Sequence, residues 1–191
     1  MKKWKKITIF VVLAAVAVFA LCLALRWPVY PDFSISVDTY DDLSEPFEDS
    51  PVIFLPQEDH IPASEYQILL DNRHRLSRKI GYCISKETMD GSTKIHYLLR
   101  CGEQNATPCD GAEEYNGVAF ETIVFPQTEQ SASRTVFLNF DIDGVPYRFA
   151  ADYSTVYLEN ENKDVTEMDA YIEAQLFSYA AQIIDQYHLN A

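Results

Sequence analysis

The amino-acid sequence predicts an α+β protein in which a single N-terminal transmembrane helix is followed by a mainly antiparallel β-sheet domain packed against a long C-terminal helix. Three observations lead to this prediction. An apolar run covers residues 7–25, Asp-Gly pairs twice separate runs of alternating polarity, and apolar residues recur at helical spacing from Met168 to Tyr187. Strands joined by hairpins and followed by one helix are typical of α+β domains.

The apolar run from Ile7 to Leu25 is long enough to span a bilayer. At 1.5 Å rise per residue it covers roughly 28 Å, close to the ~30 Å hydrocarbon core. Lysines occupy positions 2, 3, 5 and 6 before the run, whereas Arg26 alone follows it. Positive charge favours the cytoplasmic side. We therefore expect a single-pass cell-membrane protein with a cytoplasmic basic tail at 1–6 and an extracytoplasmic C-terminal domain.

Two other interpretations of this segment are weaker. A cleaved signal peptide usually has a shorter apolar core and ends at a small-x-small site. Here the only tolerable site, Cys22-Leu23-Ala24, lies inside the run. A lipidated Cys22 would normally follow a small residue, and Leu21 is not small. An uncleaved anchor is the better prediction.

Acidic residues dominate beyond the predicted membrane helix. The chain has 29 acidic and 15 basic residues, a net charge of −14, and no acidic residue precedes position 27. Nucleic acid requires a basic face, so this composition argues against it as a partner. Basic residues gather only between positions 73 and 100. They pair internally with acidic segments or bind a partner protein or anionic envelope polymer; the candidate binding residues are Arg73, Arg75, Arg78 and Lys79.

Cysteines predict a disulfide rather than a metal site. Cys101 and Cys109 bracket a short loop with turn-forming residues at both ends, and an extracytoplasmic location permits oxidation. We therefore predict a Cys101–Cys109 bridge, with Cys83 buried in a strand. The spacing lacks the close Cys pairs and nearby histidines of a zinc site, so we expect no bound metal and no other cofactor.

The first part of the outer region is less regular. Residues 26–50 form an acidic, proline-containing juxtamembrane segment in which only Phe33–Val37 alternates like a strand, and 41–50 is expected to be a loop. The α+β domain then covers 51–191 and opens with a short strand at Val52–Leu55. Residues 64–78 are ambiguous between helix and strand, because Ser64 and Gln67 match a capping box while even-numbered apolar residues favour a strand. We favour the strand.

Two β-hairpins give the clearest local signals. The runs Lys79–Thr88 and Ser92–Cys101 flank Asp90-Gly91, a typical hairpin dipeptide; a turn centred on it sets Cys83 opposite Leu98. Arg134–Ile142 and Val145–Leu158 flank Asp143-Gly144 in the same way. Between the two hairpins, Tyr115–Phe125 is expected to form one strand. With the short strands above, this gives about six or seven strands.

The C-terminal segment predicts a helix that begins at a Thr166 cap. Its first turn contains acidic residues, which the helix dipole favours. A wide apolar stripe identifies the face expected to cover the sheet; its members are Met168, Ile172, Leu176, Tyr179, Ile183 and Tyr187, widened by Tyr171, Ala180 and Ile184.

The sequence contains no common catalytic motif. It lacks the spacings of serine hydrolases, zinc proteases and nucleotide-binding loops, its four histidines are scattered, and Asp141–Gly144 matches a calcium loop poorly. The preferred hypothesis is a non-enzymatic, membrane-anchored binding module. One alternative is a cell-envelope hydrolase that uses paired carboxylates. Another is an accessory subunit whose apolar helix packs within a membrane complex.

Overall fold

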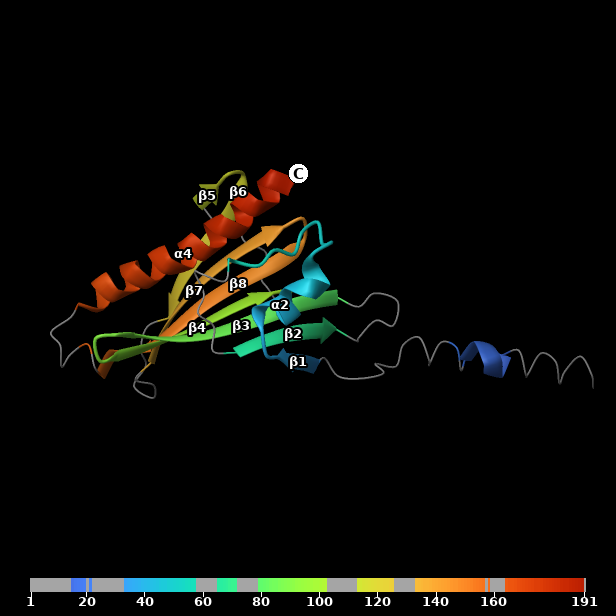
Figure 1. Cartoon of the computed structure of the whole chain (residues 1–191), viewed down its shortest axis with the longest axis horizontal. Coiled ribbons are helices and arrows are strands. Elements are labelled where there is room, and N and C mark those ends of the chain that lie inside the picture. Colours follow the sequence, from blue (N-terminus) through green and yellow to red (C-terminus); the bar gives the residue numbers. More distant parts are fainter. Residues whose placement is uncertain are drawn as a thin grey trace, which may run out of the picture. The chain divides into compact units, whose positions relative to one another are not determined.

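An eight-stranded sheet with one long helix on it forms the fold (Figure 1). The computed structural model describes residues 15–19, 21, 33–57, 65–71, 79–102, 113–125, 133–156, 158 and 164–190. The chain divides into two compact units, residues 1–33 with 70–80 and residues 34–69 with 81–191. Almost all described elements belong to the second unit. Its sheet and long C-terminal helix confirm the α+β prediction.

The strands follow the order β1-β2-β3-β4-β8-β7-β6-β5, and the neighbours from β3 to β5 in this order pair antiparallel. The helices α2 and η1 are short, whereas α4 packs on β6, β7 and β8. The elements are β1 (Phe33–Val37), α2 (Tyr40–Ser44), η1 (Glu45–Phe47), β2 (Glu65–Asp71), β3 (Lys79–Asp90), β4 (Thr93–Cys101), β5 (Glu113–Tyr115), β6 (Val118–Phe125), β7 (Ser133–Ile142), β8 (Val145–Ser154) and α4 (Val165–Asn190).

The tight turns explain where the hairpin predictions were right and wrong. The β7–β8 turn at Asp143-Gly144 is confirmed, with φ of 48° and 79° and Ile142 paired with Val145. The β3–β4 turn lies one residue later than predicted, at Gly91-Ser92. Gly91 has φ 62°, and glycine is favoured at the first position of a type II′ turn. Cys83 therefore pairs with Arg100, not Leu98.

A third hairpin divides the segment predicted to be one strand. Asn116 and Gly117 have φ of 47° and 80°, which is typical of a type I′ turn, and they connect β5 to β6. This turn and the β7–β8 turn both contact the C-terminal part of α4. The Asn116 side-chain amide donates to Asp185 at 2.8 Å, and the Tyr187 hydroxyl donates to Asp143 at 3.0 Å.

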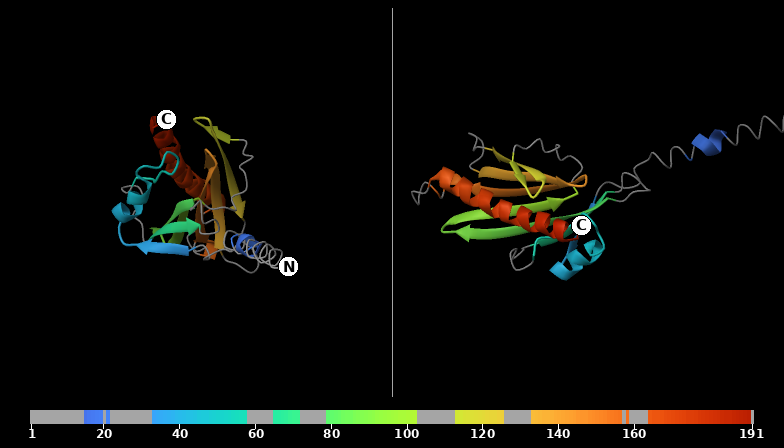
Figure 2. Two further views of the ribbon diagram at one scale, coloured as in Figure 1. Left: turned by 90° about the vertical axis from the view of Figure 1, so that its right-hand side faces the viewer. Right: turned by 90° about the horizontal axis from the view of Figure 1, so that it is seen from above.

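The helix α4 buries the predicted apolar stripe against the sheet, as Figure 2 shows for its course over one face of the strands. Two members of the stripe are exceptions: Tyr171 is 49 % exposed, and Tyr187 is only half-buried. The helix also begins earlier than predicted. A side-chain oxygen of Asp164 accepts from the backbone N–H of Thr166 at 2.9 Å, so Asp164 is the cap and Thr166 lies within the first turn.

The region before β2 is more ordered than the sequence indicated. Strand β1 is confirmed, and Glu65–Asp71 is a strand, as we favoured; residues 72–78 lie outside the described part. The predicted loop instead contains α2 and η1, because Thr39 caps α2 by accepting from Asp42 N–H at 3.1 Å. The predicted strand Val52–Leu55 is wrong. Tyrosine hydroxyls take the place of a neighbouring strand there: Tyr147 and Tyr82 bond the backbone of Phe54 at 2.9 and 2.8 Å.

The predicted membrane helix is not supported by the structure. Residues 15–19 and 21 are helical, and the rest of 7–25 lies outside the described residues. Within the part of the chain that is described, no helix is both long and apolar enough to cross a membrane.

Gly81 offers a test of the close packing between β3 and β4. A Cβ atom there would lie 2.1 Å from the carbonyl oxygen of Cys101. We expect Gly81→Ala to lower the free energy of unfolding by about 1–3 kcal/mol or more, because backbone cannot yield easily. Urea unfolding of the full chain in a nonionic detergent measures this change.

The matched control is Gly144→Ala. Its Cβ would meet no atom within 4 Å, and its strain comes only from a φ of 79°. We expect a loss of about 1 kcal/mol there. An equal or smaller loss at Gly81 than at Gly144 would contradict the steric interpretation.

Candidate functional site

The predicted basic binding site falls almost entirely outside the described residues. Arg73, Arg75 and Arg78 lie in 72–78, and Lys79 is described only as the first residue of β3, without its side chain. The structure therefore does not test this prediction.

The predicted Cys101–Cys109 disulfide is not found. Cys101 is a free thiol with 0 % of the residue exposed, and Cys109 lies outside the described residues. The Cys101 side chain is buried in the core, where it is hydrogen-bonded with Tyr147. Burial raises the pKa of the Cys101 thiol to about 12, and a hydrogen bond with Tyr147 lowers it in part. Cys83 is also a buried thiol that forms no disulfide with another described cysteine.

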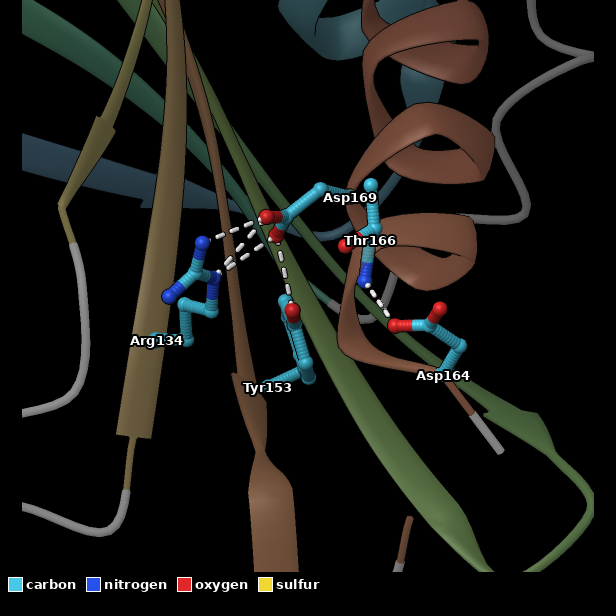
Figure 3. A network of polar contacts seen from close by, with 5 residues as sticks. All are labelled: Arg134, Tyr153, Asp164, Thr166 and Asp169. Carbon is cyan, nitrogen blue, oxygen red and sulfur yellow. Dashed lines mark hydrogen bonds and ion pairs between the residues drawn. The ribbon is translucent and has the colours of Figure 1, made fainter. Parts of the chain in front are cut away.

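Asp169 on α4 accepts several hydrogen bonds from the sheet (Figure 3). Arg134 on β7 donates from Nε to both carboxylate oxygens at 2.9 Å and from Nη2 to one of them at 2.6 Å. Tyr153 on β8 donates to the same carboxylate at 2.7 Å. Because Asp169 is 8 % exposed, this network is sheltered, and the hydrogen bond raises the pKa of Arg134. We call these three residues the Asp169 clamp.

The Asp169 clamp bears on the hypothesis that the protein is a hydrolase that uses paired carboxylates. Glu173 lies one turn further along α4, and burial, followed by the charges of Asp169 and Glu113, raises its pKa. A raised pKa beside a second carboxylate is a feature of general acids. The Asp169 carboxylate, however, is already bonded by an arginine and a tyrosine from the sheet and helps to dock α4.

A second buried charge lies between α4 and the sheet. Lys86 on β3 is 8 % exposed. Its Nζ donates to the Tyr179 hydroxyl at 3.0 Å and lies 5.6 and 5.7 Å from the ring centroids of Tyr97 and Tyr179. Such cation–π contacts stabilise a desolvated ammonium group. This lysine contributes to holding α4 on β3 and β4.

One hollow opens between α2, the segment 50–55 and the end of α4. It has a volume of about 190 Å³ and is lined by groups that include Tyr40, Phe47, Glu48 and Asn190. Pockets for small organic ligands usually measure about 300–1,000 Å³. The hollow is therefore a poor candidate for such a ligand.

The face of the sheet turned away from α4 is the remaining candidate for a binding site. In β4, side chains alternate between burial under α4 and partial exposure, and the cross-strand registers carry this alternation into neighbouring strands. We call this second face the outer face. Three rows of cross-strand partners cross it: the arginine row (Cys83, Arg100, Arg148, Asn139, Glu121), the apolar row (Ser85, Leu98, Ala150, Phe137, Ile123) and the histidine row (Glu87, His96, Asp152, Thr135, Phe125).

The outer face brings together a serine, a histidine and an aspartate. The Ser85 hydroxyl lies 2.9 Å from Nε2 of His96, and Asp152 is the cross-strand partner of His96. Serine catalysis needs the aspartate to orient the histidine. Asp152 instead accepts a hydrogen bond from Thr135, and no carboxylate of the described residues bonds His96. The arrangement is therefore not a catalytic triad.

Two arginines face each other in the arginine row. Arg100 on β4 and Arg148 on β8 are direct cross-strand partners, and the Nε of Arg148 donates to the side-chain oxygen of Asn139 at 3.0 Å. Asn139 is 6 % exposed, and the Nε atom of Arg100 is buried. Both guanidinium groups are thus partly sheltered from water. The face combines two neighbouring guanidinium groups with an adjacent apolar row.

The comparisons with known proteins add no family to this geometry. No family model matches the chain, no curated protein matches it, and no solved structure matches its fold.

Sequence reasoning missed the outer face because its members are far apart in the chain. Cys83, Arg100 and Arg148 come from three strands, and only the register makes them neighbours. One signal was present: Arg148 lies between Tyr147 and Phe149, and Asp152 lies between Ala151 and Tyr153, so the two charged residues share the parity of one strand face. A one-residue error in the β3–β4 turn was enough to give the wrong partners.

Removing the Asp169 charge tests the clamp. We expect Asp169→Asn to lower the free energy of unfolding by about 3 kcal/mol, because Arg134 would keep a sheltered charge without its counter-ion. Urea unfolding of the full chain gives this value. The control is Glu87→Gln, which breaks an exposed ion pair with Lys94 and should change stability by about 1 kcal/mol or less. Equal effects of the two substitutions would contradict the clamp's role.

Thiol labelling tests the state of Cys101. At pH 8 in the folded chain we expect a thiol reagent to leave Cys101 unlabelled, because the thiol is buried and its raised pKa keeps it protonated. In urea without reductant the same cysteine should react fully. Mass spectrometry of the peptides measures both states. Protection that persists in urea until a reductant is added would instead indicate the disulfide.

Proposed function

We propose that the protein is a non-enzymatic binding module that holds an acidic segment of a partner protein on the outer face of its sheet. The observation that carries this proposal is the apolar row lying beside the facing pair Arg100 and Arg148. Aliphatic and aromatic side chains of a partner fit the apolar row, and its carboxylates fit the guanidinium groups.

The composition of the outer face favours a protein partner over an anionic envelope polymer. Leu98, Phe137 and Ile123 are half-buried, and Phe125 at the end of the next row is 54 % exposed and packs edge-on against Phe137 at 5.4 Å. Exposed aromatic and aliphatic groups are enriched at protein interfaces. A polyanion without apolar groups would use only the arginines and leave this part uncovered.

The local positive charge of the two arginines favours an acidic partner, although the net charge of the whole chain does not. With a net charge of −14, the protein as a whole repels anions at long range. An acidic segment is therefore retained only where local donors and apolar contacts act together. Binding is therefore specific to one face, and its association rate is low because no long-range electrostatic attraction steers the partner toward the protein.

The proposal includes the placement predicted from the first residues of the chain. The run 7–25 acts as a membrane anchor, and the domain lies outside the cytoplasm. Both the packing of this helix in a larger membrane complex and a catalytic role have less support, because the donors and apolar groups described above lie on the sheet.

The partner face is tested with a photoreactive aromatic residue. We expect p-benzoylphenylalanine at Phe125 to give an adduct of defined mass in intact cells, because this position lies on the outer face. The matched control is Tyr171, which is 49 % exposed on α4 and should give none. Leu98→Glu should abolish the Phe125 adduct. Equal adducts from both positions would contradict the proposal, and an adduct that protease leaves intact would indicate a polymer.

Membrane anchoring has a separate test. We expect the full chain to stay in the membrane pellet after alkaline extraction, because roughly 28 Å of apolar helix resists release. A variant that lacks residues 1–26 should move to the supernatant. External protease should degrade the domain in cells whose outer barrier is opened. Release of the intact full chain, or complete protection from protease, would contradict this placement.

A further inference from the structure

We infer that the edge strand β1 is a second interaction surface, to which an extended, basic segment of a partner protein adds as a further strand. The inference goes beyond the proposed function, because none of the rows of the outer face takes part in it. Three features of β1 point to this use: its position in the sheet, its composition and the charges that follow it.

Strand β1 stands at one end of the sheet. It is the first strand in the order of the described strands and pairs with β2 on one side (Figure 1). Its residues 34–37 belong to the same compact unit as β4 and the strands after it. Ser34 and Ser36 are exposed, and Ile35 is 45 % exposed. The other side of such an edge strand presents backbone N–H and C=O groups that form a template for another strand.

The two edges of the described sheet differ in how strongly they oppose such an addition. Strand β5, at the opposite edge, has only three residues, and two of them are Glu113 and Glu114. Short length and charge are common means by which edge strands avoid pairing with another chain. Strand β1 has five residues and contains neither a charged residue nor a proline. Its alternation of serine with apolar residues is compatible with pairing, so β1 is the edge at which a strand is more easily added.

The charges beside β1 favour a basic segment. Asp38 directly follows the strand, and Asp41 and Asp42 lie in the first turn of α2. All three are exposed, and the sequence has no lysine or arginine between residues 27 and 72. A strand that pairs along β1 brings the residues beyond its own end close to Asp38. Lysine or arginine there is attracted by these carboxylates, whereas an acidic residue is repelled.

A second copy of the chain fits this edge less well. Two chains that each carry a net charge of −14 repel each other. Because β1 itself is uncharged, pairing it with another β1 offers no opposite charge that would offset the repulsion. A basic segment of a different protein supplies both the backbone groups for pairing and the complementary charge.

The experiment uses the full chain in a nonionic detergent and a short fluorescent peptide in which valine and threonine alternate between terminal lysines. One control peptide has glutamates in place of the lysines, and another is N-methylated at every amide, which removes its backbone donors. We expect the lysine peptide to bind saturably and both controls to bind about tenfold more weakly or less. Hydrogen–deuterium exchange should show that the lysine peptide protects the amides of residues 34–37 and leaves those of β5 unchanged.

Proline variants distinguish the open side of β1 from the side paired with β2. Successive residues of a strand direct their N–H groups to opposite sides. One of the variants Ile35→Pro and Ser36→Pro therefore removes a donor from the open side, and the other removes one that faces β2. The variant that keeps the urea midpoint of the unmodified chain should lose peptide affinity by about tenfold or more. If neither variant folds, the exchange experiment on the unmodified chain decides.

A charge variant tests the choice of a basic partner. Asp38→Asn should weaken binding of the lysine peptide by about threefold, as expected for the loss of one exposed ion pair. The matched control is Glu167→Gln, which removes an exposed acidic residue in the first turn of α4 and should leave the affinity unchanged. Equal effects of the two substitutions would show that only the net charge of the chain matters and would contradict a site at β1.

The other outcomes are also decisive. Amides of residues 34–37 that are already protected in the chain without peptide would show that another segment covers this edge, and this would overturn the inference. Equal binding of the glutamate peptide would overturn it too. A dimer in sedimentation that is lost in the folded proline variant would assign the edge to a second copy instead of a basic partner. The Phe125 adduct tests the outer face separately, so either surface can fail without the other.

Discussion

The position of α4 depends on the charge pairing at Asp169. One carboxylate on the helix is held by an arginine from β7 and a tyrosine from β8, so the first turns of α4 have one allowed position along the sheet. Apolar burial favours contact but leaves the helix free to slide. A sheltered pair of this kind contributes to specificity by excluding other positions in which its charges would be unpaired.

The opposite end of α4 is held by different means. The tips of the β5–β6 and β7–β8 hairpins contact it through Asn116 and Asp143, and Lys86 holds the middle against two tyrosines. These contacts all lie on the face of the sheet that α4 covers. The groups that dock the helix therefore differ from those of the outer face.

The sequence predicted those elements whose signals are local. The alternation of Val136, Leu138, Phe140 and Ile142 and the stripe on α4 depend only on which residues are apolar, and both are confirmed. The Val52–Leu55 strand was wrong because tyrosines distant in sequence satisfy its backbone. The Asn116-Gly117 turn was present as a dipeptide but was overlooked. The outer face depends on registers, and a one-residue shift in a turn changes every pair along two strands.

The order of the elements, with α4 after all the described strands, has a consequence for biogenesis. The inner face of the sheet includes Tyr82, Leu99, Leu138 and Phe149, all buried in the finished protein. Much of its cover is α4, a helix of 26 residues, which follows all the described strands in the sequence. During synthesis this part of the apolar side therefore stays uncovered until α4 has been made, and non-local contacts of this kind form slowly. Truncation before α4 would leave apolar groups of the sheet exposed, and exposed apolar surface of this kind promotes aggregation unless a chaperone binds it.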